Sequence, residues 1–158
     1  MDFMIQVPRA IDIELRTVNS GEVRVRDVKG RYLVRNVNGG IEMQRVAGSG
    51  TAHTVNGPVR VSFTENPREG SSFKSVNGDI ELRFAAGLSA DFRFKTFNGG
   101  IYSDYAVTAL PPRSIEQVNQ GGKRIYRADR FTSARVGSGG AEITLENLNG
   151  DIRILEKP

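Results

Sequence analysis

Five basic side chains recur at one position of a repeated motif. Each stands three residues before the Asn of an Asn-Gly or Asn-Ser-Gly sequence; they are Arg16, Arg35, His53, Lys74 and Lys95. The sixth copy of the motif carries Glu146 at this position. If the motifs stack, these side chains form a column that binds an extended polyanion, such as an anionic polysaccharide or a nucleic acid, by charge neutralisation. The alternative is that the side chains extend into water, where salt screens their repulsion.

A different chemistry, that of a carbohydrate-active β-helix enzyme, would need convergent carboxylates or a metal site. The acids of this sequence are dispersed: Asp79 and Asp151 follow motif glycines, whereas Glu42 and Glu81 belong to a column of alternating charge. His53 is the only histidine, and the chain has no cysteine. We therefore predict no catalytic residue, no metal site and no cofactor, and keep the carbohydrate-active enzyme as an alternative.

The positions of all these side chains are set by the repeat itself. The glycines of the first five motifs are 18, 18, 21 and 21 residues apart. Val or Ile stands two residues after every motif glycine, and an apolar residue stands directly before every Asn. Asn and Gly tolerate positive φ, so the motif is suited to a corner between two strands. Six motifs in phase predict an all-β fold, a β-solenoid of about six two-strand coils with Asn-Gly corners, rather than a sandwich or barrel.

The repeat is interrupted over residues 104–130. This stretch contains Pro111 and Pro112, which cannot donate hydrogen bonds to a sheet, and it is rich in polar residues. We interpret it as an insertion that either caps the stack or carries a function. The length of 158 residues otherwise fits a single β-solenoid domain over 1–158.

Two more columns follow from the same motif. The residues three after the glycine are Arg24, Glu42, Arg60, Glu81, Tyr102 and Arg153, and the first four alternate in sign. We expect this alternation to fix the register of neighbouring coils. The residues two before the Asn are Thr17, Asn36, Thr54, Ser75, Thr96 and Asn147. These side chains are expected to satisfy backbone groups at the corner.

Composition limits the partners only loosely. The chain has 22 Lys and Arg against 18 Asp and Glu, a net charge of +4 that favours anionic partners without demanding them. Residues 1–8 lack the pattern of a signal peptide, and no apolar run approaches the ~20 residues of a membrane span. Because open coils leave strand edges unpaired, end-to-end self-association is a further hypothesis.

Several segments together resemble a known family. They are Ile5-Gln6-Val7-Pro8, the Thr-Val-Asn-Gly type corners, Gly78-Asp79-Ile80-Glu81-Leu82, the Pro-containing insertion, Gly139-Gly140-Ala141-Glu142-Ile143 and Asn149-Gly150-Asp151-Ile152-Arg153-Ile154. These resemble the bacterial adhesin-like family of β-strand-repeat domains of unknown function. The resemblance implies a β-helix-like fold, a bacterial source and a place in the cell envelope or outside the cell. It brings no catalytic residues, so it favours a non-catalytic structural or interaction module.

Overall fold

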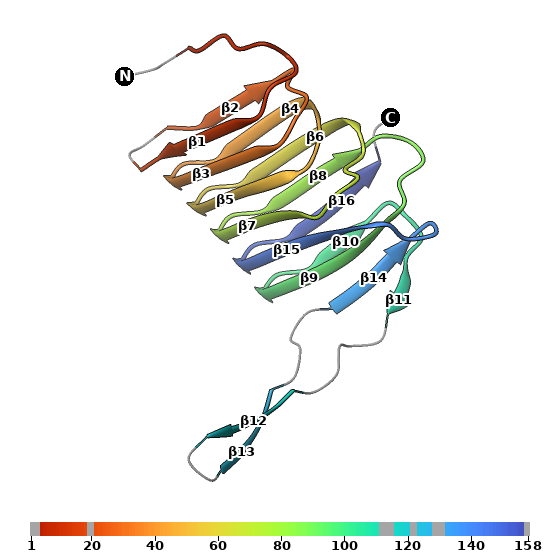
Figure 1. The fold of residues 1–158 in the computed structure, drawn as a ribbon. Helices are drawn as coiled ribbons and strands as arrows, with labels where there is room; N and C mark the ends of the chain where they lie inside the picture. The colour runs from red at the N-terminus through yellow and green to blue at the C-terminus, as the bar shows by residue number, and fades with distance from the viewer. Residues whose placement is uncertain (1–3, 19–20, 111–115, 121–122, 128–131, 157–158) are drawn as a thin grey trace.

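The computed structural model describes residues 4–18, 21–110, 116–120, 123–127 and 132–156, which form two facing sheets of mainly parallel strands and one hairpin (Figure 1). The eight-stranded sheet has the spatial order β1 (Ile13–Thr17), β3 (Tyr32–Asn38), β5 (Gly50–Asn56), β7 (Ser71–Asn77), β15 (Ala141–Asn149), β9 (Ala90–Asn98), β14 (Thr132–Val136) and β11 (Thr108–Leu110). The six-stranded sheet has the order β10 (Ile101–Ser103), β16 (Ile152–Glu156), β8 (Ile80–Phe84), β6 (Val59–Glu65), β4 (Ile41–Ala47) and β2 (Val23–Arg26). The hairpin pairs β12 (Glu116–Gln120) with β13 (Lys123–Arg127).

Each coil consists of a strand of the first sheet followed by a strand of the second, and from the second coil onward an Asn-Gly corner joins them. The described residues form six such coils, from β1–β2 to β15–β16, which confirms the predicted β-solenoid. None of the described residues forms a helix with the length and apolarity to cross a membrane.

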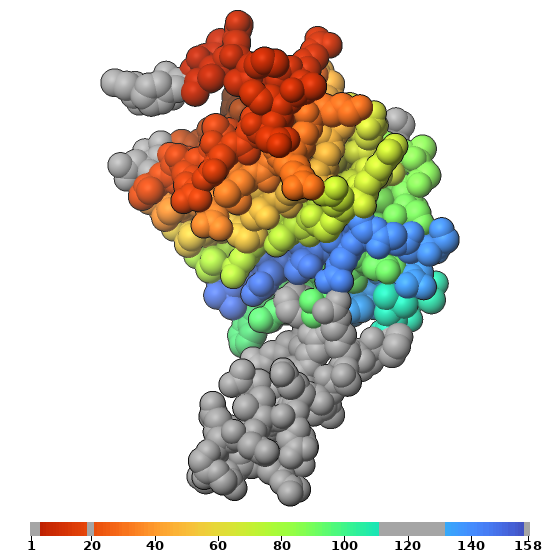
Figure 2. Space-filling model, viewed as in Figure 1, coloured from red at the N-terminus to blue at the C-terminus, as the bar shows by residue number. Residues whose placement is uncertain are grey.

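The coils do not stack in chain order. The sixth coil, β15–β16, lies between the fourth coil, β7–β8, and the fifth coil, β9–β10. Asn149 is accordingly in register with Asn77 on one side and Asn98 on the other. In Figure 2 the blue band of residues 141–149 separates the yellow-green band of β7 from the green band of β9. The inserted coil pairs along two edges in each sheet, where a coil added at the end would pair along one.

One end of the larger sheet is extended beyond the coils. β14 pairs antiparallel with β9, and β11 pairs antiparallel with β14. Ala134 and Val136 of β14 are buried, and Arg135 donates to both carboxylate oxygens of Asp91 at 2.7 and 3.2 Å, which lowers the pKa of Asp91. The edge of β9 is thus covered by β14, which follows the predicted insertion, and β11 of the insertion covers β14 in turn. Residues 111–115, 121–122 and 128–130 of the insertion lie outside the described residues.

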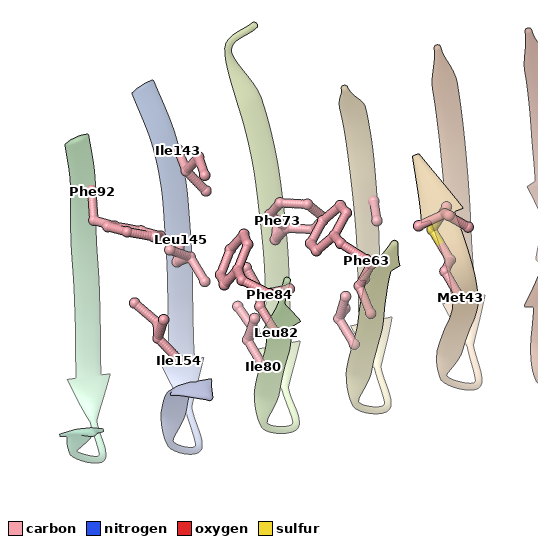
Figure 3. Packing of buried hydrophobic residues seen from close by; sticks show 14 of the residues in the cluster. Met43, Phe63, Phe73, Ile80, Leu82, Phe84, Phe92, Ile143, Leu145 and Ile154 are labelled. Atoms are coloured by element: carbon pink, nitrogen blue, oxygen red, sulfur yellow. The ribbon is translucent and has the colours of Figure 1, made fainter. Parts of the chain in front are cut away.

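The space between the sheets is filled by inward side chains from both strands of the coils, except in the fifth coil, where all residues of β10 are exposed (Figure 3). Phe63, Phe73, Phe84 and Phe92 are fully buried. The rings of Phe63 and Phe84 stack with centroids 5.0 Å apart, and those of Phe84 and Phe92 meet edge to face at 5.7 Å. This aromatic packing crosses the inserted sixth coil and ties the fourth coil to the fifth.

The corners are held by a continuous ladder of asparagine side chains. The side-chain amides of Asn56, Asn77, Asn149 and Asn98 each donate to the amide oxygen of the preceding Asn in the stack, beginning with Asn38, at distances of 2.8 to 3.1 Å. Asn38 itself donates to the backbone carbonyl of Val18 at 3.3 Å. Beside it, the predicted polar column donates to glycine carbonyls of the next corner, as Ser75 does to Gly57 at 2.8 Å and Asn147 to Gly78 at 2.7 Å. The column thus fulfils the backbone-bonding role expected from the sequence.

The corner glycines are in contact from coil to coil. A Cβ on Gly150 would lie 2.5 Å from the carbonyl oxygen of Gly78, whereas a Cβ on Gly21 would meet no atom. Both have a φ of 145°, so they share the same backbone penalty for a side chain. We predict that Gly21→Ala costs about 1 kcal/mol of unfolding free energy and Gly150→Ala about 3 kcal/mol. Equal costs by urea denaturation would contradict close stacking of the corners.

The terminal corner differs chemically from the others. The N–H groups of Gly39, Gly57, Gly78 and Gly150 each donate to the Asn carbonyl of the next coil. The N–H of Gly99 has no acceptor among the described residues, and Asn98 is exposed. Deamidation requires the nitrogen after an Asn to attack its side-chain carbonyl and expel ammonia, so a hydrogen-bonded N–H is protected. We predict that the folded chain deamidates first at Asn98.

Peptide mass spectrometry after incubation at mildly alkaline pH measures this order. In urea, where every corner is open, the Asn-Gly sites should react at similar rates. Folded protein that deamidates at Asn56 or Asn77 as fast as at Asn98 would show that the corner hydrogen bonds do not protect.

Candidate functional site

Four of the predicted basic-type residues form an uninterrupted row on the outer face of the eight-stranded sheet. We call Arg16, Arg35, His53 and Lys74 the basic row. The strand register pairs Arg16 with Arg35, Arg35 with His53, and His53 with Lys74. Adjacent members are therefore separated by one strand spacing, about 4.8 Å.

The fifth residue, Lys95, is not adjacent to the row. Because the sixth coil lies between the fourth and fifth, Glu146 stands between Lys74 and Lys95. Its carboxylate oxygen Oε1 lies 3.8 Å from Nζ of Lys74 and 3.6 Å from Nζ of Lys95. The sequence placed Glu146 after five consecutive basic residues; this order is wrong, since strand pairing and not chain order decides which side chains are neighbours.

The residues of the basic row differ in how readily they could contact an incoming anion. Arg16 is paired with Glu14 on its own strand, at 2.8 Å, and both side chains are well exposed. Arg35 is exposed and forms no ion pair within the described part of the chain. Lys74 shares Glu146 with Lys95. Exposed pairs of this kind are worth at most about 1 kcal/mol, so an incoming anion can compete with them.

His53 reports the electrostatics of the row. It is half-buried, and its Nε2 lies 3.1 Å from the hydroxyl oxygen of Ser72. Desolvation lowers the pKa of His53, and the positive charges of Lys74 and Arg35 lower it further. The row therefore has a positive potential that the nearby Glu146 only partly offsets.

On the outer face of the six-stranded sheet, charged side chains of opposite sign alternate, in contrast to the like charges of the basic row. In spatial order its central column is Arg24, Glu42, Arg60, Glu81, Arg153 and Tyr102. The insertion of the sixth coil extends the alternation of charge by Arg153, whose guanidinium lies 5.8 Å from the ring centroid of Tyr102. Alternating neighbours attract one another, which supports the expected role in register.

Carboxylates come together in two places that the sequence did not reveal. Asp79 and Asp151 are neighbours because β16 pairs with β8, and they accept backbone N–H groups and contact Arg153 at 3.5 and 3.2 Å. Glu42 and Glu81 line a shallow cavity of about 430 Å³.

These carboxylates are all engaged. Glu42 accepts from Gln44 at 2.5 Å and lies 3.8 Å from Arg24, and Glu81 pairs with Arg83 at 2.9 Å. This is the arrangement of a surface ion-pair network rather than of a free acid and base. Among the described residues no three His, Asp or Glu side chains cluster in a way that could hold a metal ion.

The fold narrows the predicted end-to-end association to particular edges. The edge strands are β1 and β2 at one end of the stack and β11 and β10 at the other, so a second copy would have to pair with one of these two ends. Arg24 and Arg26 lie on the exposed side of β2, and such charges discourage edge pairing. Self-association stays a prediction, which sedimentation at increasing concentration can test.

Comparison with known proteins places this architecture in a family. The family model that matches is Toastrack DUF4097, over residues 9–155. The chain belongs to this family. Toastrack DUF4097 is a family of unknown function, and its β-solenoid agrees with the resemblance inferred from the corners. Searches of curated proteins and of solved structures gave no match.

The charge of the basic row can be measured through its histidine. Because this Toastrack domain has one histidine, its imidazole signals in an NMR titration are unambiguous. We predict that Lys74→Gln raises the pKa of His53, since it removes a nearby cation. Arg83→Gln removes the same charge from the other sheet and should leave this pKa nearly unchanged. An equal shift in both variants would mean that net charge alone sets the pKa.

Proposed function

We propose that this chain is a non-catalytic interaction module that binds polyanions through the basic row. The observation that supports this most is the register of β1, β3, β5 and β7, which holds four basic-type side chains in adjacent positions. A ligand with closely spaced negative charges can lie along such a row and exchange its counterions for fixed cations.

The contrast between the two sheets favours this surface. The central column of the six-stranded sheet alternates cations and anions, so its neighbouring charges attract one another. The basic row places like charges next to one another, which is unfavourable in the free protein. A bound polyanion relieves this repulsion, and it would also raise the pKa of His53 and add a charge to the row.

We also propose that the module works at the cell envelope or outside the cell. This location follows from the resemblance to the bacterial adhesin-like domains. Fractionation of cells that express the natural protein tests it, and recovery from the cytoplasm alone would contradict it.

Binding to dextran sulfate over a salt series tests the basic row. With three to four cations neutralised, the logarithm of the binding constant should fall with that of salt with a slope of roughly −2 to −3. Arg35→Ser with Lys74→Ser should weaken binding and reduce the slope by about 1.4. Binding should also tighten as the pH falls through the pKa of His53.

Two variants serve as controls. Arg60→Gln with Arg83→Gln removes the same charge from the other sheet and should change binding little. Glu146→Gln should strengthen binding, because it joins Lys95 to the row. If the two double variants behave alike, or if Glu146→Gln weakens binding, the basic row is not the binding surface.

A further inference from the structure

A second row of side chains lies beside the basic row. The residue before each corner Asn faces outward on the eight-stranded sheet; in spatial order these residues are Val18, Val37, Val55, Val76, Leu148 and Phe97, which we call the apolar row. Phe97 is 78% exposed, Val18 63%, Leu148 44% and Val55 39%. These side chains are apolar, as core residues are, but they do not belong to the hydrophobic core.

Strand preference alone does not explain the row. A valine on an exposed strand is common, because β-branched residues favour extended backbone. Leu148 and Phe97 carry larger side chains than the valines, and Phe97 is the most exposed of the row. Six apolar side chains in adjacent positions, bordered by basic-type residues and Glu146 on one side and by the Asn ladder on the other, have the composition of an interaction surface.

The shape and charge of this surface limit what it can bind. The apolar row lies two positions along each strand from the basic row, about 6.6 Å away, and both rows run in parallel across the coils. It lies where the chain turns from one sheet to the other, so it forms a projecting edge rather than a groove for a peptide. Apolar side chains on an edge backed by cations match the interface of an anionic bilayer.

We propose that this edge of the stack docks on an anionic phospholipid surface. The apolar row inserts at the boundary between headgroups and acyl chains, and the basic row lies against the phosphates. This inference rests on the proposed function, since it uses the same cations and identifies the source of the anions.

Vesicle binding and a fluorescent reporter test the inference together. The chain contains no Trp, so Phe97→Trp introduces a single reporter at the most exposed position of the row. Its emission should shift to the blue with vesicles of phosphatidylcholine and phosphatidylglycerol, and not with phosphatidylcholine alone. Tyr102→Trp places the reporter on the other sheet of the same coil, exposed to 55%, and should not shift.

Cosedimentation then separates the two rows. Phe97→Ser with Leu148→Ser should reduce binding to anionic vesicles at least tenfold and leave dextran sulfate binding unchanged. Arg35→Ser with Lys74→Ser should reduce both. Circular dichroism and urea denaturation of each variant verify that the fold is retained.

Each other outcome overturns the inference. If the chain binds dextran sulfate but not anionic vesicles, the proposed function stands and docking on a membrane is excluded. If it binds neither, both proposals are wrong. Vesicle binding that does not depend on the apolar row would be simple electrostatic adsorption. A dimer in sedimentation velocity that Phe97→Ser with Leu148→Ser abolishes, with no vesicle binding, would assign the row to a second copy.

Discussion

The structure depends on stacking identical corners at one strand spacing. At each inner corner the glycine N–H donates to the Asn carbonyl of the next coil, the Asn side chains bond to one another, and no Cβ separates the glycines. Because these contacts are made by the backbone and by one amide per coil, they leave the outward positions of the strands free to vary. The same contacts fix the register, and the register decides which outward side chains are neighbours.

The core makes this register unique. Inward residues of both sheets meet across the stack, and the buried rings from Phe73 through Phe63 and Phe84 to Phe92 link the third, fourth and fifth coils, the last two across the inserted sixth coil. A slip of one residue would turn these rings to solvent. The surface rows are therefore rigid features, spaced by the backbone rather than by side-chain flexibility, which suits recognition of a repeating or extended ligand.

The insertion of the sixth coil has the largest effect on the surface. It places Glu146 between Lys74 and Lys95 and so limits the basic row to four coils. On the other sheet it places Arg153 after Glu81, which completes an alternation that Tyr102 interrupts in the sequence. One topological feature therefore sets the length of the run of cations on one sheet and of the alternation of charge on the other, and this contrast between the two columns supports the proposed binding face.

The sequence by itself determined the coils, their corners and the side chains that share a column, because the Asn-Gly motif carries its backbone preference locally and recurs in phase. The order of the columns, the cluster of Asp79 with Asp151 and the outward apolar row were decided only by the tertiary structure. Because every coil carries the same corner motif, any two coils can stack on each other. The position of the sixth coil is therefore decided by core packing and by the pairing of its strands with neighbours on both sides.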